Sequence, residues 1–387
     1  MTSWITKLLA LGLAAAATIA AGAQPVIVGA VVSQSGAQAS LAADYRKALL
    51  LWRDEVNAAG GLLGRPVELR LLDDGSHAVR AGPLYAELIR DHKADLLIGP
   101  YGSAATLLAA AEAERSRRVM VNGAGAASTV HKRSPQYVFQ SAIPYSAYGE
   151  GVLELARSAG CRQLFILAND NAAAAEMAGA AHAAARSQGF SAGQAETYSG
   201  GTAGFTVALE KARAAGADCW IAFGGARDAA EMVKTFKKAG YAPRLFFASG
   251  STRRNFIELV GQDAEFTLGV MEYDARFATP GNAQFARAFA ARWSARPGRA
   301  AAEGYAAATV LAEAVRRAGA LDQHKLRSAL AALEIDTVLG AYRVNPANGA
   351  QVGMKPAVTQ IVEGRPQIVS SATLQPYPRW NERRLLK

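Results

Sequence analysis

The chain contains few of the residues that carry catalysis or hold metal ions. Its 387 residues include only two cysteines and five histidines, and the histidines are dispersed. None of them forms an H-E-x-x-H motif or a pair at ligand spacing, and no G-x-S-x-G nucleophile elbow or P-loop occurs. The run from Gly123 to Ser128 is one residue short of a dinucleotide fingerprint and follows the fourth expected strand rather than the first. The sequence therefore supports no metal site, no cofactor and no enzyme built on these motifs.

Concentrated positive charge is also absent, although basic residues are in excess. The chain has 42 basic and 32 acidic residues, a formal net charge of +10. The basic clusters are short and scattered, as at 115–118 and 234–238. A nucleic-acid binder usually carries a basic stripe interleaved with aromatic residues on one element, and no such stripe occurs. We expect solvated helix faces, no nucleic-acid partner and at most a mild preference for anionic ligands.

Long apolar runs are missing except at the N-terminus. Residues 8–20 are apolar or small and follow the single charge of Lys7, and Ala21-Gly22-Ala23 fits the pattern that signal peptidase reads. The run is short for a membrane span, which needs roughly 20 residues. We expect residues 1–23 to be a cleaved signal peptide and the mature chain to be periplasmic, with an uncleaved anchor as the alternative. No cysteine follows the run, so we expect no lipid anchor.

Strands and amphipathic helices alternate along the mature chain, which predicts an α/β protein with parallel sheets. The alternation occurs twice, so we expect two doubly wound parallel-sheet lobes with the ligand crevice at the carboxyl ends of their strands. Expected crossovers lie near 142–148, 273–277 and 339–344. These crossovers assign 24–143 and 274–340 to the first lobe, 144–273 and 341–375 to the second, and 376–387 to a C-terminal tail.

The two cysteines each precede a short apolar run that is typical of a buried parallel strand, at 164–167 after Cys161 and at 220–223 after Cys219. Such strands are neighbours in a doubly wound sheet, so the two side chains are expected to lie close together. An oxidising compartment permits a disulfide between them. Two buried thiols are the alternative.

Loops of small residues follow the expected strands of the first lobe. A helix N-terminus offers free N–H groups and partial positive charge to a carboxylate, and small residues let a ligand approach the backbone. Each loop by itself is also explained as a tight strand–helix turn, but together they predict a ligand site. Its candidate residues are Ser35 after the first strand, Tyr101, Gly102 and Ser103 after the third, and Ala124, Gly125 and Ala126 after the fourth.

Several motifs resemble one known family. They are the run Asn-Ala-Ala-Gly-Gly-Leu-Leu-Gly-Arg-Pro from Asn57 to Pro66, the pair Asp73-Asp74, Ile98-Gly99-Pro100 and the late Gly340-Ala341-Tyr342. The chain is similar in these motifs to the periplasmic leucine/isoleucine/valine-binding proteins, the receptors of branched-chain amino-acid ABC transporters. This resemblance spans nearly the whole mature chain. It implies a type I periplasmic-binding fold with three crossovers, a ligand between the lobes, an inner-membrane permease as partner, a monomer and no reaction.

The resemblance carries over to the pocket only in part. It implies that Ser103 and the backbone at Ala124 meet a ligand carboxylate. The family's threonine after the fourth strand is replaced by Ala126, its second-lobe tyrosine is missing from 171–175, and its acidic residue is missing from 248–251. An uncompensated ammonium in a closed cleft would cost several kcal/mol. We therefore expect either an amino acid or an amine-free aromatic acid, keto acid or amide.

Further candidates lie in the second half of the chain. Asp170 and Asp228 are candidates for a replacement acid, and Arg227 for meeting a second carboxylate. The remaining expected ligand-binding residues are Tyr148, Asn171 and Ser249.

Three functions are compatible with these observations to different degrees. The first is a periplasmic solute-binding receptor of an ABC importer. The second is a ligand-sensing subunit with the same fold that signals to a partner receptor. The third is an enzyme, which would need a nucleophile with a base in reach, and no spacing in the sequence indicates one. We expect the first.

Overall fold

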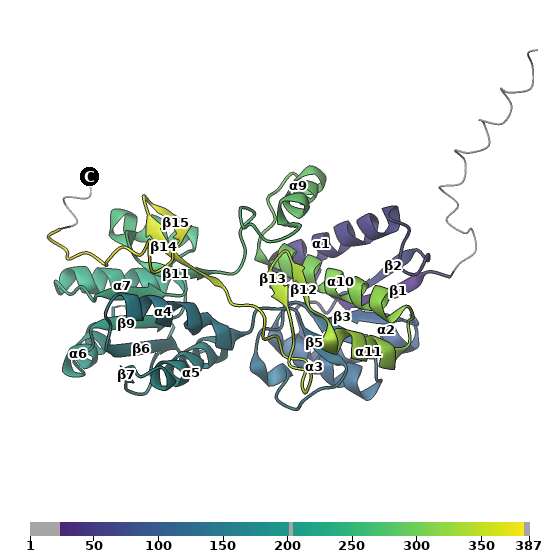
Figure 1. Cartoon of the computed structure of the whole chain (residues 1–387), viewed down its shortest axis with the longest axis horizontal. Coiled ribbons are helices and arrows are strands. Elements are labelled where there is room, and N and C mark those ends of the chain that lie inside the picture. The colour runs from purple at the N-terminus through teal and green to yellow at the C-terminus, as the bar shows by residue number, and fades with distance from the viewer. Residues whose placement is uncertain (1–23, 201–203, 383–387) are drawn as a thin grey trace, which may run out of the picture.

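The computed structural model describes residues 24–200 and 204–382, and the expected signal peptide at 1–23 lies outside these residues. The chain forms two α/β lobes that lie side by side (Figure 1). Helices cover both faces of a mainly parallel sheet in each lobe, so the predicted fold class is confirmed. No helix of the described residues has the length and apolar character that a membrane crossing requires.

The first lobe contains a five-stranded parallel sheet in the order β2-β1-β3-β4-β5. Its strands are β1 Val26–Val31, β2 Val67–Leu72, β3 Leu96–Ile98, β4 Met120–Asn122 and β5 Val138–Gln140. Its helices are α1 Ala39–Ala58, α2 Ala81–Arg90, α3 Ser103–Arg115, α9 Asn282–Trp293, α10 Arg299–Ala318 and α11 Gln323–Ala332, with short 3-10 turns η1 Ala78–Arg80 and η2 Ser128–Val130.

Period-two alternation explains why both faces of this sheet are covered. Leu96 and Ile98 of β3 pack into the core that α1 and α10 cover, whereas Leu97 packs into the opposite core with α2 and α3. Because every strand residue of β3 is buried, the run contains no polar position. Because β3 and β4 are parallel neighbours, their carboxyl ends reach the same edge of the sheet, where the loops before α3 and after β4 begin.

The second lobe contains an eight-stranded sheet in the order β15-β14-β11-β10-β9-β6-β7, with β8 also paired to β6. Strands β14 and β15 run antiparallel and extend an otherwise parallel sheet. The strands are β6 Gln163–Asn169, β7 Ser191–Ala192, β8 Glu196–Tyr198, β9 Cys219–Phe223, β10 Leu245–Ala248, β11 Leu268–Met271, β14 Ala357–Val362 and β15 Arg365–Ile368. The helices are η3 Tyr145–Gly149, α4 Glu150–Ser158, α5 Ala172–Ser187, α6 Thr206–Ala214, α7 Ala226–Lys238, α8 Arg254–Val260 and η4 Gly261–Ala264.

The family-like run after α1 is a turn that joins this helix to β2. Gly60 and Gly61 have φ angles of +95° and +80°, and a Cβ on Gly61 would lie 2.0 Å from the carbonyl oxygen of Arg65. Asn57 then joins helix to strand, because its side chain accepts the N–H of Val67 at 2.7 Å and donates to the carbonyl of Val67 at 3.0 Å. The run therefore stabilises the connection between α1 and β2.

The third crossover differs from the expectation near 339–344. The strands β12 Ile335–Thr337 and β13 Gly340–Tyr342 form a hairpin, and the buried Tyr342 hydroxyl donates to the carbonyl of Leu330 in the first lobe. The carbonyl of Gly349 then accepts the N–H of Gln140 at 2.8 Å. These contacts keep the chain on the first lobe as far as residue 351, and it enters the second lobe with β14. The segment 341–351, which the sequence assigned to the second lobe, therefore packs on the first.

The described part of the C-terminal tail packs on the second lobe. Tyr377 is buried, with its ring centroid 5.6 Å from that of Phe246. The indole N–H of Trp380 donates to the carbonyl of Tyr241 at 2.6 Å. Tyr377 is thus part of the second-lobe core, and the partly buried Trp380 packs against it.

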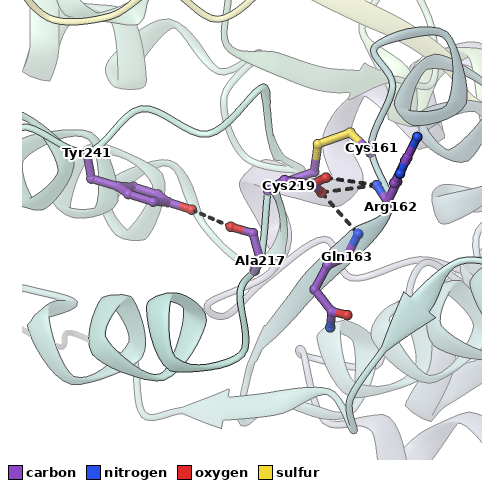
Figure 2. The surroundings of a disulfide bond; sticks show 7 residues. Cys161, Arg162, Gln163, Ala217, Cys219 and Tyr241 are labelled. Carbon is purple, nitrogen blue, oxygen red and sulfur yellow. Dashed lines mark hydrogen bonds between the residues drawn. A yellow bond between two sulfur atoms is a disulfide. The ribbon is translucent and has the colours of Figure 1, made fainter.

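The two cysteines form a disulfide at one end of the second-lobe sheet (Figure 2). Cys161 lies two residues before β6 and Cys219 begins β9, and these strands are adjacent, so the two Cα atoms lie 5.9 Å apart. The Asp218 carboxylate accepts the N–H groups of Arg162 and Gln163 beside the bond. Cys161, Asp218 and Cys219 are also the only metal-capable trio among the described residues, but the bond leaves no thiolate to ligate a metal.

We expect replacement of both cysteines by serine to lower the free energy of unfolding by about 4 kcal/mol, because the bond closes a loop with a sequence separation of 58. Urea unfolding of the wild type and the double variant, each with and without reductant, measures this loss. Reductant should destabilise only the wild type. Two free thiols in the unfolded, unreduced wild type would contradict the bond.

Candidate functional site

A cavity of about 240 Å³ lies between the lobes, at the carboxyl ends of the second-lobe strands. Arg299 at the start of α10 contributes the first-lobe wall. The second-lobe wall comes from the loops after β9, β10 and β11 and from α5, and the first crossover supplies two tyrosines. The polar and charged side chains that line the cavity are those of Tyr145, Tyr148, Ser249, Arg253, Glu272 and Arg299.

The loop before α3 is held against the loop after β4 by the Ser103 hydroxyl. This oxygen accepts the N–H of Ala127 at 3.2 Å and also hydrogen-bonds the Tyr145 side chain, which lines the cavity. Gly102 precedes the helix with a φ of +93°, and no side chain caps the helix N-terminus. The first-turn N–H groups of α3 are therefore left without a side-chain cap beside the cleft.

The loop after β4 is shaped by a buried asparagine. Asn122 donates to the carbonyl of Gly125 and accepts its N–H, both at 2.7 Å. A Cβ on Gly125 would lie 2.6 Å from the Thr106 hydroxyl, so only glycine fits there. Tyr101 forms a β-bridge with Ala124, and the carbonyl of Ala126 accepts the N–H of Tyr145. The structure thus brings together the six predicted residues that follow the third and fourth strands, beside Tyr145, although none of the six is among the residues that line the cavity.

Ser35 lies in a different network. Its hydroxyl donates to the Asp73 carboxylate at 2.6 Å, and the same carboxylate accepts the backbone N–H of Gln34. The Ser35 hydrogen bond is the largest cause that lowers the pKa of Asp73, to about 2. Ser33 likewise donates to Asp74 at 2.6 Å. These two serine–aspartate hydrogen bonds join the loop after β1 to the loop after β2 in the first lobe. Ser35 does not line the cavity.

The second-lobe candidates divide between the cavity and helix capping. Tyr148 and Ser249 line the cavity, although the Ser249 hydroxyl already bonds the N–H and the carbonyl of Gly224. Asn171 caps α5 by accepting the N–H of Ala174 at 3.0 Å. Neither Asn171 nor the exposed Arg227 is among the residues that line the cavity.

Neither candidate acid is available to a ligand amine in the cavity. The Asp228 carboxylate accepts the Tyr198 hydroxyl at 2.9 Å and the N–H of Gly225 at 3.0 Å, and so caps α7. Asp170 is exposed and does not line the cavity. Both residues follow strands as the sequence indicates, but their side chains serve the loops rather than the cleft.

An ion cluster that the sequence reasoning missed lies where the lobes meet. Arg299 is 3.3 Å from Glu272, which follows β11, and 3.6 Å from Glu303, one turn further along α10. Tyr148 donates its hydroxyl to Glu272 at 3.0 Å. The only sequence signal was the i,i+4 spacing of Arg299 and Glu303, which usually marks an exposed pair. The cluster connects the first lobe, the second lobe and the first crossover.

Burial changes the acid–base behaviour of this cluster. The Glu303 side chain is 6% exposed, and its Oε2 has no hydrogen-bond partner among the described residues. Burial raises the pKa of Glu303 to about 7, against the lowering effect of Arg299 and with a further rise from Glu272. Burial and the Glu272 charge also raise the pKa of Tyr148 well above its usual range, so its hydroxyl remains a donor.

Two lobes with a cavity between them and small-residue loops at the strand ends are the arrangement of a ligand-capturing receptor. A family model described as periplasmic binding protein matches residues 25–366. The chain therefore belongs to the periplasmic binding protein family, whose members are solute-binding receptors of ABC transporters and not enzymes.

Similar proteins support this assignment. Leu/Ile/Val-binding protein homolog 8 of Brucella abortus (strain 2308) is 23% identical over 344 residues, which cover 84% of this chain and 85% of that protein. The branched-chain amino acid transporter substrate binding protein LivJ of Streptococcus pneumoniae, in complex with isoleucine, has a TM-score of 0.68 and 21% identity, over 89% of this chain and 98% of that one. A solute binding protein from Rhodopseudomonas palustris BisB5, in complex with 3,4-dihydroxybenzoic acid, has a TM-score of 0.70 and 20% identity, over 89% of this chain and 96% of that one.

The raised pKa of Glu303 predicts a pH-dependent stability. Its folded-state pKa of about 7 exceeds the ordinary value of 4.5, so the folded protein retains a proton that the unfolded chain releases. The stabilisation is complete below the ordinary pKa and is lost as the pH rises to about 7. Between about pH 5 and about pH 8, we expect wild type to lose roughly 3 kcal/mol relative to Glu303→Gln.

Urea unfolding of both proteins at the two pH values measures this difference. Glu313→Gln, on the same helix but in a surface pair with Arg316 and Arg317, is the matched control and should follow wild type. Parallel pH profiles for wild type and Glu303→Gln would show that the buried carboxyl does not retain its proton.

Proposed function

We propose that this chain is the periplasmic solute-binding receptor of an ABC importer and captures a small carboxylate-bearing ligand between its lobes. The proposed ligand classes are an amino acid, an amine-free aromatic or keto acid, and an amide. The observation that carries the proposal is the cavity at the strand ends, because its walls come from both lobes and from the first crossover. A ligand bound there would favour the closed arrangement of the lobes.

The helix ends around the cleft support a carboxylate. Asn171 caps α5 and Asp228 caps α7, whereas no side chain caps α3, α8 or α10. The starts of α8 and α10 carry Arg253 and Arg299, and α3 is the uncapped helix that begins with a serine. The partial positive charge of an uncapped helix N-terminus favours an anion, and Ser103 adds a hydroxyl at the same place. We infer that the ligand carboxylate binds to the first turn of α3 and to the loop at Ala124–Ala126.

The names of the similar structures support two of the three ligand classes. One neighbour was solved with isoleucine and another with 3,4-dihydroxybenzoic acid. Both ligands carry a carboxylate, but only isoleucine carries an ammonium. The fold therefore accommodates both kinds of acid, and the choice between them depends on the cavity of this chain.

The partners and the location follow from the same proposal. We infer export through the apolar segment at residues 8–20, which precedes the small-x-small pattern at 21–23. The disulfide between Cys161 and Cys219 supports an oxidising compartment. A monomer that delivers its ligand to an inner-membrane permease is the arrangement that we propose.

A thermal-shift screen of residues 24–387 tests the function. The panel contains aliphatic amino acids, aromatic acids, keto acids, dicarboxylates and amides. A ligand at 100 times its dissociation constant adds about 2.7 kcal/mol to the stability, a readily visible shift. A shift with a carboxylate-bearing compound is the expected result, and turnover of that compound would instead indicate an enzyme.

We expect Ser103→Ala to weaken binding of that compound about tenfold or more, because a hydrogen bond to a charged group contributes roughly 1.5–3 kcal/mol. Calorimetric titration measures the affinity. Ser116→Ala, at the other end of α3, is the matched control, since the Ser116 hydroxyl donates to Glu112 on its own helix. Unchanged affinity in Ser103→Ala would remove this residue from the site.

A further inference from the structure

Three charged side chains line the cavity, and two of them neutralise each other. Arg299 pairs with Glu272 and is also held by Glu303. The third is Arg253, which precedes α8. The Arg253 residue is exposed, and its guanidinium has no hydrogen-bond or ion-pair partner among the described residues. The cavity therefore contains one cation that its own neighbours do not compensate.

No carboxylate of the lining is similarly available. Oε1 of Glu272 accepts the Tyr148 hydroxyl and faces Arg299 at 3.3 Å. Glu303 is buried behind Arg299 and is not among the lining residues. A ligand ammonium in this cavity would meet an uncompensated guanidinium and a carboxylate that is already paired. A guanidinium has five N–H donors and no acceptor, so Arg253 can hydrogen-bond only an acceptor atom of the ligand.

We infer that Arg253 determines the specificity of the cavity and selects amine-free acids with a second oxygen acceptor, of which 2-oxo acids are the simplest. This inference rests on the proposed function, because it assumes that the ligand enters this cavity. The start of α3 does not itself line the cavity but is joined to it by the hydrogen bond between Ser103 and the lining residue Tyr145. When the lobes close, the carboxylate binds at the start of α3, and the second oxygen accepts from the Arg253 guanidinium. An α-amino acid places an ammonium where the 2-oxo acid places its carbonyl, and the positive charge of Arg253 opposes that ammonium.

Leucine and 4-methyl-2-oxopentanoate test the inference, because they share a carbon skeleton and differ only in the amine and the carbonyl. Phenylalanine and phenylpyruvate form a second pair for a larger side chain. Calorimetric titration of the purified protein should show at least tenfold tighter binding of the 2-oxo acid in the pair that fits the cavity. Tighter binding of the amino acid would overturn the inference.

Variants at two neighbouring arginines separate the guanidinium from the overall charge. Arg253→Gln should weaken binding of the 2-oxo acid about tenfold or more and reduce its preference over the amino acid. Arg254→Gln removes the same charge one residue further along, where the side chain pairs with Glu258 outside the cavity, and should bind as wild type. Equal affinities of wild type and Arg253→Gln would overturn the inference. The melting temperatures without ligand show that both variants fold.

Failure of the inference is distinguishable from failure of the proposed function. If leucine binds to wild type and to Arg253→Gln with the same affinity, Arg253 has no role in specificity, and the carboxylate receptor stands. If no acid or amide of the panel binds, both the proposed function and the role of Arg253 are wrong.

Discussion

One largely buried ion cluster links the two lobes. Arg299 begins a helix of the first lobe, and it lies between Glu303 on its own helix and Glu272 at the exit of β11 in the second lobe. Removing charges from water is costly unless each charge is paired and hydrogen-bonded, so these groups constrain one another. Tyr148 adds the first crossover to the same cluster. Any closing motion of the lobes must preserve or exchange these contacts, which lie beside the ligand cavity.

Close packing of small residues positions the first-lobe half of the site. A Cβ on Gly304 of α10 would lie 2.8 Å from the carbonyl oxygen of Tyr45 in α1, so the two helices approach more closely than larger residues would allow. The Tyr45 hydroxyl, fully buried by this packing, donates to the carbonyl of Gly99 directly after β3. The close approach at Gly304 thus helps to place the backbone that leads into α3.

The sequence predictions were correct where the signal lies in neighbouring residues and wrong where it depends on contacts between residues far apart in the chain. The apolar runs after Cys161 and Cys219 indicated adjacent strands, because such signals reside in a few consecutive residues. The third crossover was placed too early because the β12–β13 hairpin returns to the first lobe through the tertiary contact of Tyr342. The antiparallel pairing of β14 and β15 similarly depends on which edge of the sheet is open.

The sequence by itself determined the fold class, the family resemblance and the strand-exit loops that hold the candidate site residues, because periodicity and turn residues act locally. The tertiary structure decided which side chains of those loops face the cavity. Ser35 is engaged by Asp73, 38 residues away, and Asp228 by Tyr198, 30 residues away, so neither is available to a ligand. Glu272 and Arg299, 27 residues apart, belong to different lobes and meet only after folding. A side chain's role in this cleft is set by its partners, and most of those partners are distant in the chain.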